Sequence, residues 1–205
     1  MRKVLMIMFM TLDGVAEFPE YGEDRLSESD HEDPMWTHRM QTIDTLLLGR
    51  KTYEKWAAYW PARKTDPKSS TFQREFSLFA DRTNKVVFSK SLTAAEWPNS
   101  RVARDPEDEV TRLKALPGKD MALGGGPRLA QFFLERSLVD EILIEVFPSI
   151  VGGGKPLFRV ASTPDNPEDF IPLGAPGRHD FKLLESKGEG DGSVFLHYSR
   201  DVSAT

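Results

Sequence analysis

Residues 121–134 read Met121-Ala122-Leu123-Gly124-Gly125-Gly126-Pro127-Arg128-Leu129-Ala130-Gln131-Phe132-Phe133-Leu134, an apolar strand that leads through three glycines into an amphipathic helix. Glycine lets the backbone approach a ligand closely, and the free N–H groups at the start of a helix favour an anion. A second stretch of the same kind runs from Thr45 through Gly49 to Glu54. Two such strand-to-helix turns predict a ligand that carries several phosphates.

The composition predicts one globular domain over residues 1–205. The chain is 39% hydrophobic, which is enough for one core, and its formal net charge of −5 argues against nucleic acid as a partner. There is no cysteine, so disulfides and cysteine nucleophiles are excluded. Because the four histidines show no metal-ligand spacing, we expect no metal.

The N-terminus imitates a secretory signal, because Arg2 and Lys3 precede the apolar run 4–10. The run is far shorter than the ~20 residues of a membrane span. It also leads directly into Thr11-Leu12-Asp13-Gly14, which has the composition of a strand end and a tight turn. We therefore expect a buried first strand in a cytoplasmic protein with no membrane partner.

Strands and helices alternate along most of the chain. Apolar runs predict strands at 4–10, 43–48, 85–88, 101–103, 120–123 and 141–146, and helical spacing predicts helices at 35–42, 52–59, 71–79, 105–116 and 128–136. Trp60-Pro61 is expected to end the helix at 52–59. Strands at 181–185 and 194–198, joined by a glycine-rich turn, predict a hairpin. The fold class is therefore α/β, a mostly parallel twisted sheet with an antiparallel C-terminal hairpin and flanking helices.

Two common phosphate-binding arrangements are excluded by the positions of the glycines. No segment has the spacing of a Walker cradle, in which four residues separate a glycine from Gly-Lys-Ser or Gly-Lys-Thr. A doubly wound dinucleotide fold would place its glycines after the first strand, where this chain has the turn at 11–14.

The order of the motifs resembles the dihydrofolate reductase-like fold, and specifically the reductase domain of the riboflavin-pathway deaminase-reductase, RibD. Five stretches carry the resemblance: Leu12-Asp13-Gly14, Ile43 to Glu54, Val86 to Ser89, Gly124-Gly125-Gly126, and Pro148 with the run from Gly152 to Phe158. Together they span about residues 1–199. The resemblance implies an NADPH-dependent reductase that forms a homodimer, with the C-terminal hairpin as a contact surface.

The resemblance also assigns cofactor residues by position. It implies phosphate contacts at two helix starts, an adenosine-ribose contact, a nicotinamide contact and a late glycine loop that closes the far side of the site. The residues, in that order, are Gly49, Arg50 and Thr52; Gly124, Gly125 and Gly126; Ser89 and Lys90; Thr11; and Gly153 and Gly154. Since Arg50 and Lys90 are basic, NADPH is favoured over NADH.

Two carboxylates are the candidate catalytic residues, because a hydride reductase must also manage a proton. Asp13 would lie beside the nicotinamide. Asp33 precedes Gly49 by 16 positions, the interval at which dihydrofolate reductase carries a carboxylate. Each residue also has a structural reading, in which Asp13 shapes a turn and Asp33 caps a helix ahead of Pro34.

Residues 15–34 carry eight carboxylates against one cation, Arg25. We expect this segment to form a surface loop, and such a loop would repel a phosphorylated substrate. The chain also lacks the cysteines of the RibD deaminase zinc site, so deaminase activity is excluded. Three hypotheses remain open: a stand-alone NADPH reductase of a small heterocyclic or carbonyl substrate, a true dihydrofolate reductase, and a non-catalytic NADP-binding dimeric module.

Overall fold

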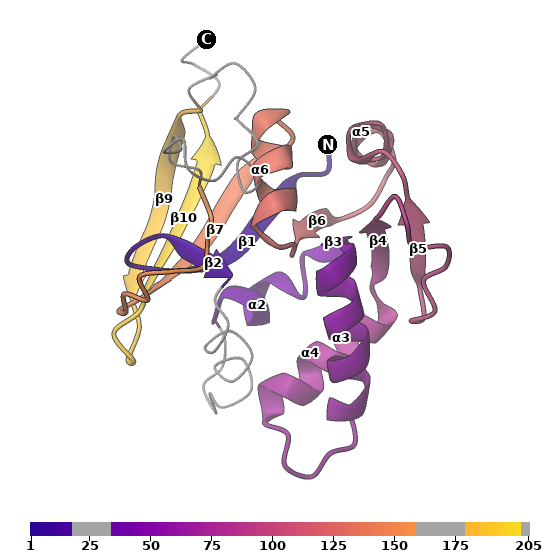
Figure 1. The fold of residues 1–205 in the computed structure, drawn as a ribbon, viewed down its shortest axis with the longest axis horizontal. Helices are drawn as coiled ribbons and strands as arrows, with labels where there is room; N and C mark the ends of the chain where they lie inside the picture. The colour runs from indigo at the N-terminus through magenta and orange to yellow at the C-terminus, as the bar shows by residue number, and fades with distance from the viewer. Residues whose placement is uncertain (18–33, 159–178, 202–205) are drawn as a thin grey trace.

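In the computed structural model of this chain, the described residues are 1–17, 34–158 and 179–201. They form an eight-stranded sheet in the order β5-β4-β3-β6-β1-β7-β10-β9 (Figure 1). The strands are β1 (Val4–Thr11), β3 (Ile43–Gly49), β4 (Asn84–Phe88), β5 (Ser100–Ala103), β6 (Asp120–Leu123), β7 (Glu141–Phe147), β9 (Phe181–Gly188) and β10 (Val194–Arg200).

The direction of the strands confirms the predicted fold class. All neighbours from β5 to β7 pair in parallel, whereas β10 pairs antiparallel with both β7 and β9. The chain thus leaves the parallel part of the sheet at β7 and returns as a hairpin at one edge, where β9 is the outermost strand.

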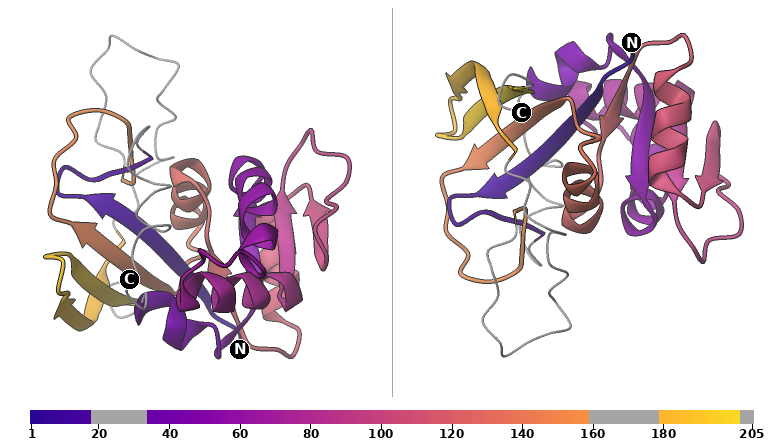
Figure 2. Two further views of the ribbon diagram at one scale, coloured as in Figure 1. Left: turned by 90° about the horizontal axis from the view of Figure 1, so that it is seen from below. Right: turned by 90° about the horizontal axis from the view of Figure 1, so that it is seen from above.

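The helices cover both faces of the sheet (Figure 2). Their bounds are α2 (Pro34–Arg39), α3 (Arg50–Arg63), α4 (Thr71–Arg82), α5 (Pro106–Lys114) and α6 (Pro127–Glu135). Buried side chains of α5 and α6 pack on one face, and those of α2, α3 and α4 pack on the other. Two helix starts follow from side-chain caps, since Ser70 forms a capping box with Gln73 and Asp105 accepts from the N–H groups that follow it.

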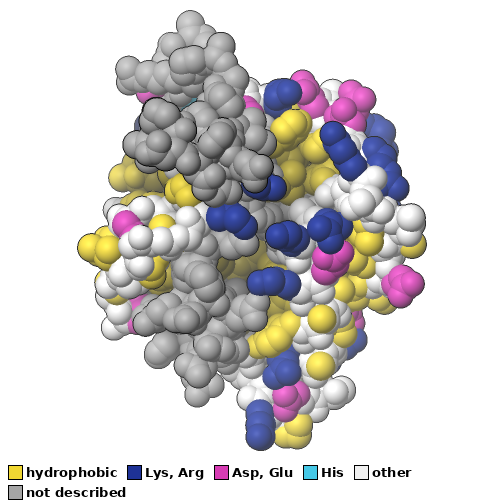
Figure 3. Space-filling model, viewed as in Figure 1, with side chains coloured by type: hydrophobic (Ala, Val, Ile, Leu, Met, Phe, Trp, Pro, Cys, Tyr) yellow, Lys and Arg dark blue, Asp and Glu magenta, His cyan; other side chains and the backbone are white. Residues whose placement is uncertain are grey.

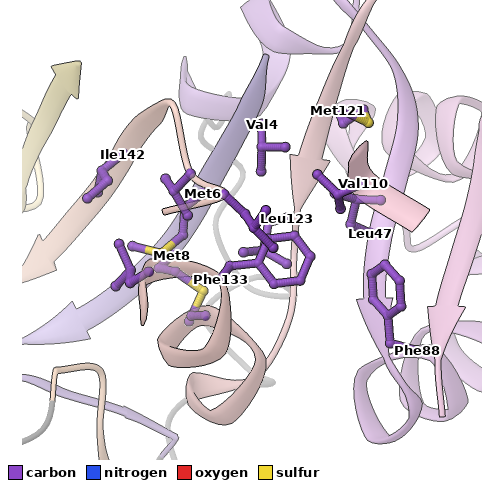
Figure 4. Packing of buried hydrophobic residues seen from close by; sticks show 14 of the residues in the cluster. Val4, Met6, Met8, Leu47, Phe88, Val110, Met121, Leu123, Phe133 and Ile142 are labelled. Atoms are coloured by element: carbon purple, nitrogen blue, oxygen red, sulfur yellow. The ribbon is translucent and has the colours of Figure 1, made fainter. Parts of the chain in front are cut away.

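Both faces of β1 are buried because its side chains alternate between the two helix layers. Val4, Met6 and Met8 belong to the cluster with α5 and α6, shown in Figure 4, and Leu5 and Ile7 belong to the cluster on the opposite face. This is the pattern of a central parallel strand, and it explains why the N-terminal run is continuously apolar.

The predicted end of the helix at Trp60-Pro61 is wrong, because α3 continues through Pro61 to Arg63. Proline removes one backbone hydrogen bond inside a helix. Trp60 compensates by burying its indole against Phe76, with ring centroids 4.4 Å apart. The Ser77 hydroxyl also donates to the carbonyl oxygen of Trp60 at 2.6 Å. Packing against α4 therefore holds the last turn in helical form.

Two short strands join the loops beyond the carboxyl ends of β1 and β7. β2 (Val15–Glu17) pairs antiparallel with β8 (Lys155–Pro156). The Leu157 N–H donates to the Gly14 carbonyl at 2.8 Å, which extends the contact. None of the described helices has the length and apolarity needed to cross a membrane.

Two charged side chains are buried in the sheet away from this region. Lys85 is 1% exposed, and its ammonium group donates to the carbonyl oxygens of Ala80 and Thr83. Burial lowers the pKa of Lys85 to about 8. Glu141 accepts from the Lys3 ammonium at 2.6 Å and lies 2.8 Å from His197 Nε2.

Candidate active site

The predicted cofactor residues lie where the parallel strands of the sheet have their carboxyl ends, here called the ligand edge. Four neighbouring parallel strands, β4, β3, β6 and β1, each end at this edge. Ser89 and Lys90 follow β4, Gly49 ends β3, Gly124 follows β6, and Thr11 ends β1. In open α/β sheets this edge is where ligands bind.

The starts of α3 and α6 lie next to each other at this edge. Gly49 caps α3 and Gly126 caps α6, and neither cap is made by a side chain. A Cβ atom built on Gly49 would lie 3.8 Å from Cδ2 of Leu129, in the first turn of α6. Pro127 opens α6 without an N–H, and the Leu129 N–H donates to the Gly126 carbonyl at 3.0 Å, so α6 offers the N–H of Arg128. That group and the first N–H groups of α3 can serve one ligand, as the diphosphate of a dinucleotide requires. Arg50 and Thr52 lie in the first turn of α3.

Close packing accounts for the glycine at position 125. A Cβ on Gly125 would lie 3.0 Å from Cδ2 of Leu129. A Cβ on Gly124 would lie 3.4 Å from the Trp56 indole, which covers the turn. A side chain at position 125 would force the Leu129 side chain to shift by a few tenths of an ångström.

Cationic side chains surround the paired helix starts. Figure 3 shows Lys and Arg side chains over the start of α3 and the base of α6. Arg50 makes an ion pair at 3.0 Å with Glu54 in the same helix, and Lys90 is exposed. Sequence reasoning missed Arg104, whose guanidinium donates to the Ser89 carbonyl at 2.6 Å. It also missed Arg128, an exposed side chain in the first turn of α6.

A sequence signal existed for both missed arginines. Arg104 directly follows the strand next to β4 in the sheet, and Arg128 directly follows Gly126-Pro127. The residue that follows a parallel strand, or that opens the helix after a glycine turn, lies at the ligand edge.

Asp13 joins the turn after β1 to the loop after β7. Its carboxylate accepts from the Thr11 hydroxyl and from the Gly152 N–H at 2.8 Å, with Val151 N at 3.5 Å. These hydrogen bonds, chiefly the one from Thr11, lower the pKa of Asp13. A carboxylate held in its ionised form is a poor proton donor at neutral pH, so the geometry favours a positioning role for Asp13.

The late glycine loop is fixed by this contact. Gly14 and Gly152 have φ values of 77° and 68°, which glycine adopts without strain. Gly153 and Gly154 follow within the same loop, and β8 then returns the chain to β2. The other candidate catalytic residue, Asp33, lies outside the described residues.

An apolar cavity of about 150 Å³ opens beside the glycine turn. Its described walls come from β1, β2, α2, α3, α4 and the turn itself: Ile7, Met8, Phe9, Ala16, Trp36, Thr52, Trp56, Trp60, Phe72, Phe76, Gly124 and Gly125. No side chain in this set carries a charge. Sequence reasoning missed the cavity as a whole, because its walls come from segments far apart in the chain.

Comparison with known proteins identifies the family of the chain. The model of the RibD C-terminal domain family matches residues 2–166. YyaP, an uncharacterized protein of Bacillus subtilis strain 168, is 33% identical over 157 residues, which is 77% of this chain and 80% of YyaP.

Two solved structures share the fold. A protein of Shewanella sp. PV-4 named for riboflavin biosynthesis matches with a TM-score of 0.69 and 20% identity, over 98% of this chain and 99% of that one. Dihydrofolate reductase from Enterococcus faecalis, complexed with NADP(H), matches with a TM-score of 0.57 and 13% identity, over 97% and 96% of the two chains. The family match and the shared fold lead to one conclusion: this chain belongs to the RibD C-terminal domain family.

Proposed function

We propose that this chain is an NADPH-dependent reductase of a small heterocyclic or carbonyl compound. The observation that carries the proposal is the adjacency of the two helix starts. A Cβ atom added to Gly49, which caps α3, would lie 3.8 Å from Cδ2 of Leu129 in the first turn of α6. One diphosphate can accept hydrogen bonds from both helix starts at once. Membership of a family that contains the RibD reductase domain supports the same activity.

The residues at this edge fit the parts of NADPH. The first N–H groups of α3, the Arg128 N–H of α6, and the side chains of Arg50, Thr52 and Arg128 would hold the diphosphate. Lys90, which follows Ser89, and Arg104, which donates to the Ser89 carbonyl, would hold the 2′-phosphate that distinguishes NADPH from NADH. NADPH supplies the hydride when it is bound.

The nicotinamide end would lie toward Thr11 and the late glycine loop. In this arrangement Asp13 acts as a positioning residue, because its hydrogen bonds hold Gly152 against the end of β1. Asp33 remains the candidate for handling the proton, by the position that the family resemblance assigns to it.

Isothermal titration calorimetry with NADPH and NADH tests the proposal. Wild-type protein should bind one NADPH per chain at least tenfold more tightly than NADH. Lys90→Ala and Arg104→Ala should each weaken NADPH binding about tenfold and leave NADH binding unchanged, because each removes a charged contact to one phosphate. Lys68→Ala, which removes an exposed lysine from the loop between α3 and α4, serves as the control. Absence of NADPH binding by folded wild-type protein would overturn the proposal.

We also propose that the chain forms a homodimer through the edge of the sheet at β9. Leu183 and Leu184 on this outermost strand are 48% and 51% exposed, although both are large and apolar. Light scattering after size-exclusion chromatography should give the mass of a dimer for the wild type and of a monomer for the double variant Leu183→Glu, Leu184→Glu. A monomeric wild type would refute this part.

A further inference from the structure

A polar cavity of about 360 Å³ lies at the end of the sheet opposite the ligand edge. Its described walls come from the amino ends of β3, β4 and β5, from the last turn of α5 and from the chain before β1. We infer that this cavity binds a sugar phosphate, at a site separate from the proposed cofactor site. The inference is independent of the proposed function, because it uses none of the residues assigned to NADPH.

The cavity is too far from the ligand edge to be an extension of the cofactor site. Thr45 lies opposite Asn84 in the pairing of β3 with β4, and Lys85 lies opposite Ser100 in the pairing of β4 with β5. These residues lie at or near the start of their strands, whereas Ser89 follows the other end of β4. At about 3.3 Å per residue, the stretch from Asn84 to Ser89 spans about 16 Å. A small ligand in the cavity would therefore not touch the two helix starts.

The described walls of the cavity are cationic. They carry four Lys or Arg side chains against one carboxylate, although the whole chain has a formal net charge of −5. Two of these cations already have partners inside the protein. The Lys85 ammonium donates to two backbone carbonyls, and Arg2 pairs with Asp44, which is the carboxylate in the wall. The other two cations, Arg101 and Arg112, can meet a ligand.

One carboxylate holds these two arginines next to each other. Oε1 of Glu109 accepts from Arg112 Nη2 at 2.7 Å and also from Arg101 Nη2. The Glu109 side chain is 13% exposed, whereas those of Arg101 and Arg112 are 44% and 54% exposed. A guanidinium group has five N–H donors, so both arginines keep donors for a phosphate. Two cations and one carboxylate leave a net positive charge, which favours an anion.

Three further polar groups in the walls can bind the hydroxyl groups of a sugar. The Ser100 hydroxyl oxygen is buried and has no hydrogen-bond partner. The side-chain amides of Asn84 and Asn99 donate to backbone carbonyls at 3.3 and 2.9 Å, and their carboxamide oxygens accept no hydrogen bond from the described residues. A buried polar atom without a partner indicates a missing water or ligand. These groups therefore suit a ligand that carries hydroxyls as well as a phosphate.

The volume fits a small metabolite. Sites for small molecules usually measure about 300–1,000 Å³, and the cavity, at about 360 Å³, lies near the lower limit. A phosphorylated three- to six-carbon sugar or polyol is a compound of this size class.

Isothermal titration calorimetry with two pairs of probes tests the inference. The pairs are glucose 6-phosphate with glucose, and glycerol 3-phosphate with glycerol, and the members of each pair differ only by the phosphate. At least one of the two phosphate esters should bind with a Kd below about 1 mM. It should bind at least tenfold more tightly than its unphosphorylated counterpart and than inorganic phosphate, because the arginines and the hydroxyl-binding groups act together. Excess NADP⁺ should leave its affinity unchanged.

Variants locate the binding. Arg101→Ala and Arg112→Ala should each weaken binding of the ester about tenfold, and in each variant Glu109 keeps the other arginine as a partner, so the fold should tolerate the change. Ser100→Ala should weaken binding about fivefold without lowering the melting temperature, because its hydroxyl has no partner inside the protein. Arg128→Ala removes an exposed arginine at the ligand edge and should leave binding of the ester unchanged.

The other outcomes contradict the inference. Failure of both esters to bind at about 10 mM would overturn it, as would unchanged binding in Arg101→Ala and Arg112→Ala. Inorganic phosphate that binds as tightly as the esters would show that the cavity recognises a bare oxyanion. Weaker binding of the ester in excess NADP⁺ or in Arg128→Ala would place it at the ligand edge. None of these titrations requires NADPH to bind, so their result is distinct from the test of the proposed function.

Discussion

Replacing Gly125 by alanine should destabilise the protein, whereas the same change at Gly153 should not. At Gly125 the new Cβ would lie 3.0 Å from Cδ2 and 3.2 Å from Cβ of Leu129, both closer than ordinary van der Waals contact. Overpacking of this kind costs about 1–3 kcal/mol. Alanine also restricts the unfolded chain, and this raises the unfolding free energy by about 0.4–1 kcal/mol. The two ranges give a net loss of unfolding free energy between about 0 and 2.6 kcal/mol, with about 1 kcal/mol at mid-range.

Gly153 is the matched control. No atom outside its neighbours lies within 4 Å of an added Cβ, and its φ is not in the left-handed region. Gly153→Ala should therefore raise the unfolding free energy by about 0.4–1 kcal/mol. Urea denaturation followed by circular dichroism gives both values. Calorimetry should also show weaker NADPH binding by Gly125→Ala, because Leu129 lies in the first turn of α6. The reasoning is refuted if Gly125→Ala is as stable as Gly153→Ala.

Three further predictions concern charged side chains. Because burial lowers the pKa of Lys85 to about 8, its folded form loses a proton that the unfolded chain keeps up to about pH 10.5. In urea titrations, the unfolding free energy of the wild type minus that of Lys85→Met should thus rise from pH 8 to pH 10. A difference that does not change with pH would contradict the lowered pKa of Lys85. Burial alone would raise the pKa of Glu141, but hydrogen bonds from Lys3 and His197 lower it. Glu141→Ala should lower the unfolding free energy by about 2–4 kcal/mol at pH 7. This loss should become smaller below pH 4.5, as the Glu141 carboxyl of the wild type takes up a proton. An equal loss at pH 3 would contradict the lowered pKa. Asp13→Asn should speed amide hydrogen exchange at Gly152 and leave the pH dependence of kcat unchanged, whereas loss of one limb of the pH profile would show that Asp13 transfers the proton.

Much of the fold could be predicted from the sequence because local signals agreed with the global arrangement. The apolar run of β1 fits a strand buried on both faces, and Asp105-Pro106 fits a capped helix start at α5. The helix end at Pro61 was mispredicted because proline is a local signal, whereas the contact of Trp60 with Phe76 joins two helices. Tertiary packing decided that element.

The phosphate edge was predictable and the substrate side was not. Gly49 ends β3 and Gly124 follows β6, and because neighbouring parallel strands end together, the proximity of the two glycines follows from the topology. The hydrogen bond between Asp13 and Gly152 spans 139 positions, and no local pattern announces it. The aromatic cavity likewise depends on how α2, α3 and α4 pack on the sheet.

A crystal structure with NADP⁺ bound is the measurement that tests the central claim most directly. The account predicts one nucleotide per chain, with its diphosphate between the starts of α3 and α6, its 2′-phosphate beside Lys90 and Arg104, and its nicotinamide directed toward Thr11. A nucleotide bound anywhere else on the chain, or a diphosphate held by only one of the two glycine turns, would contradict it.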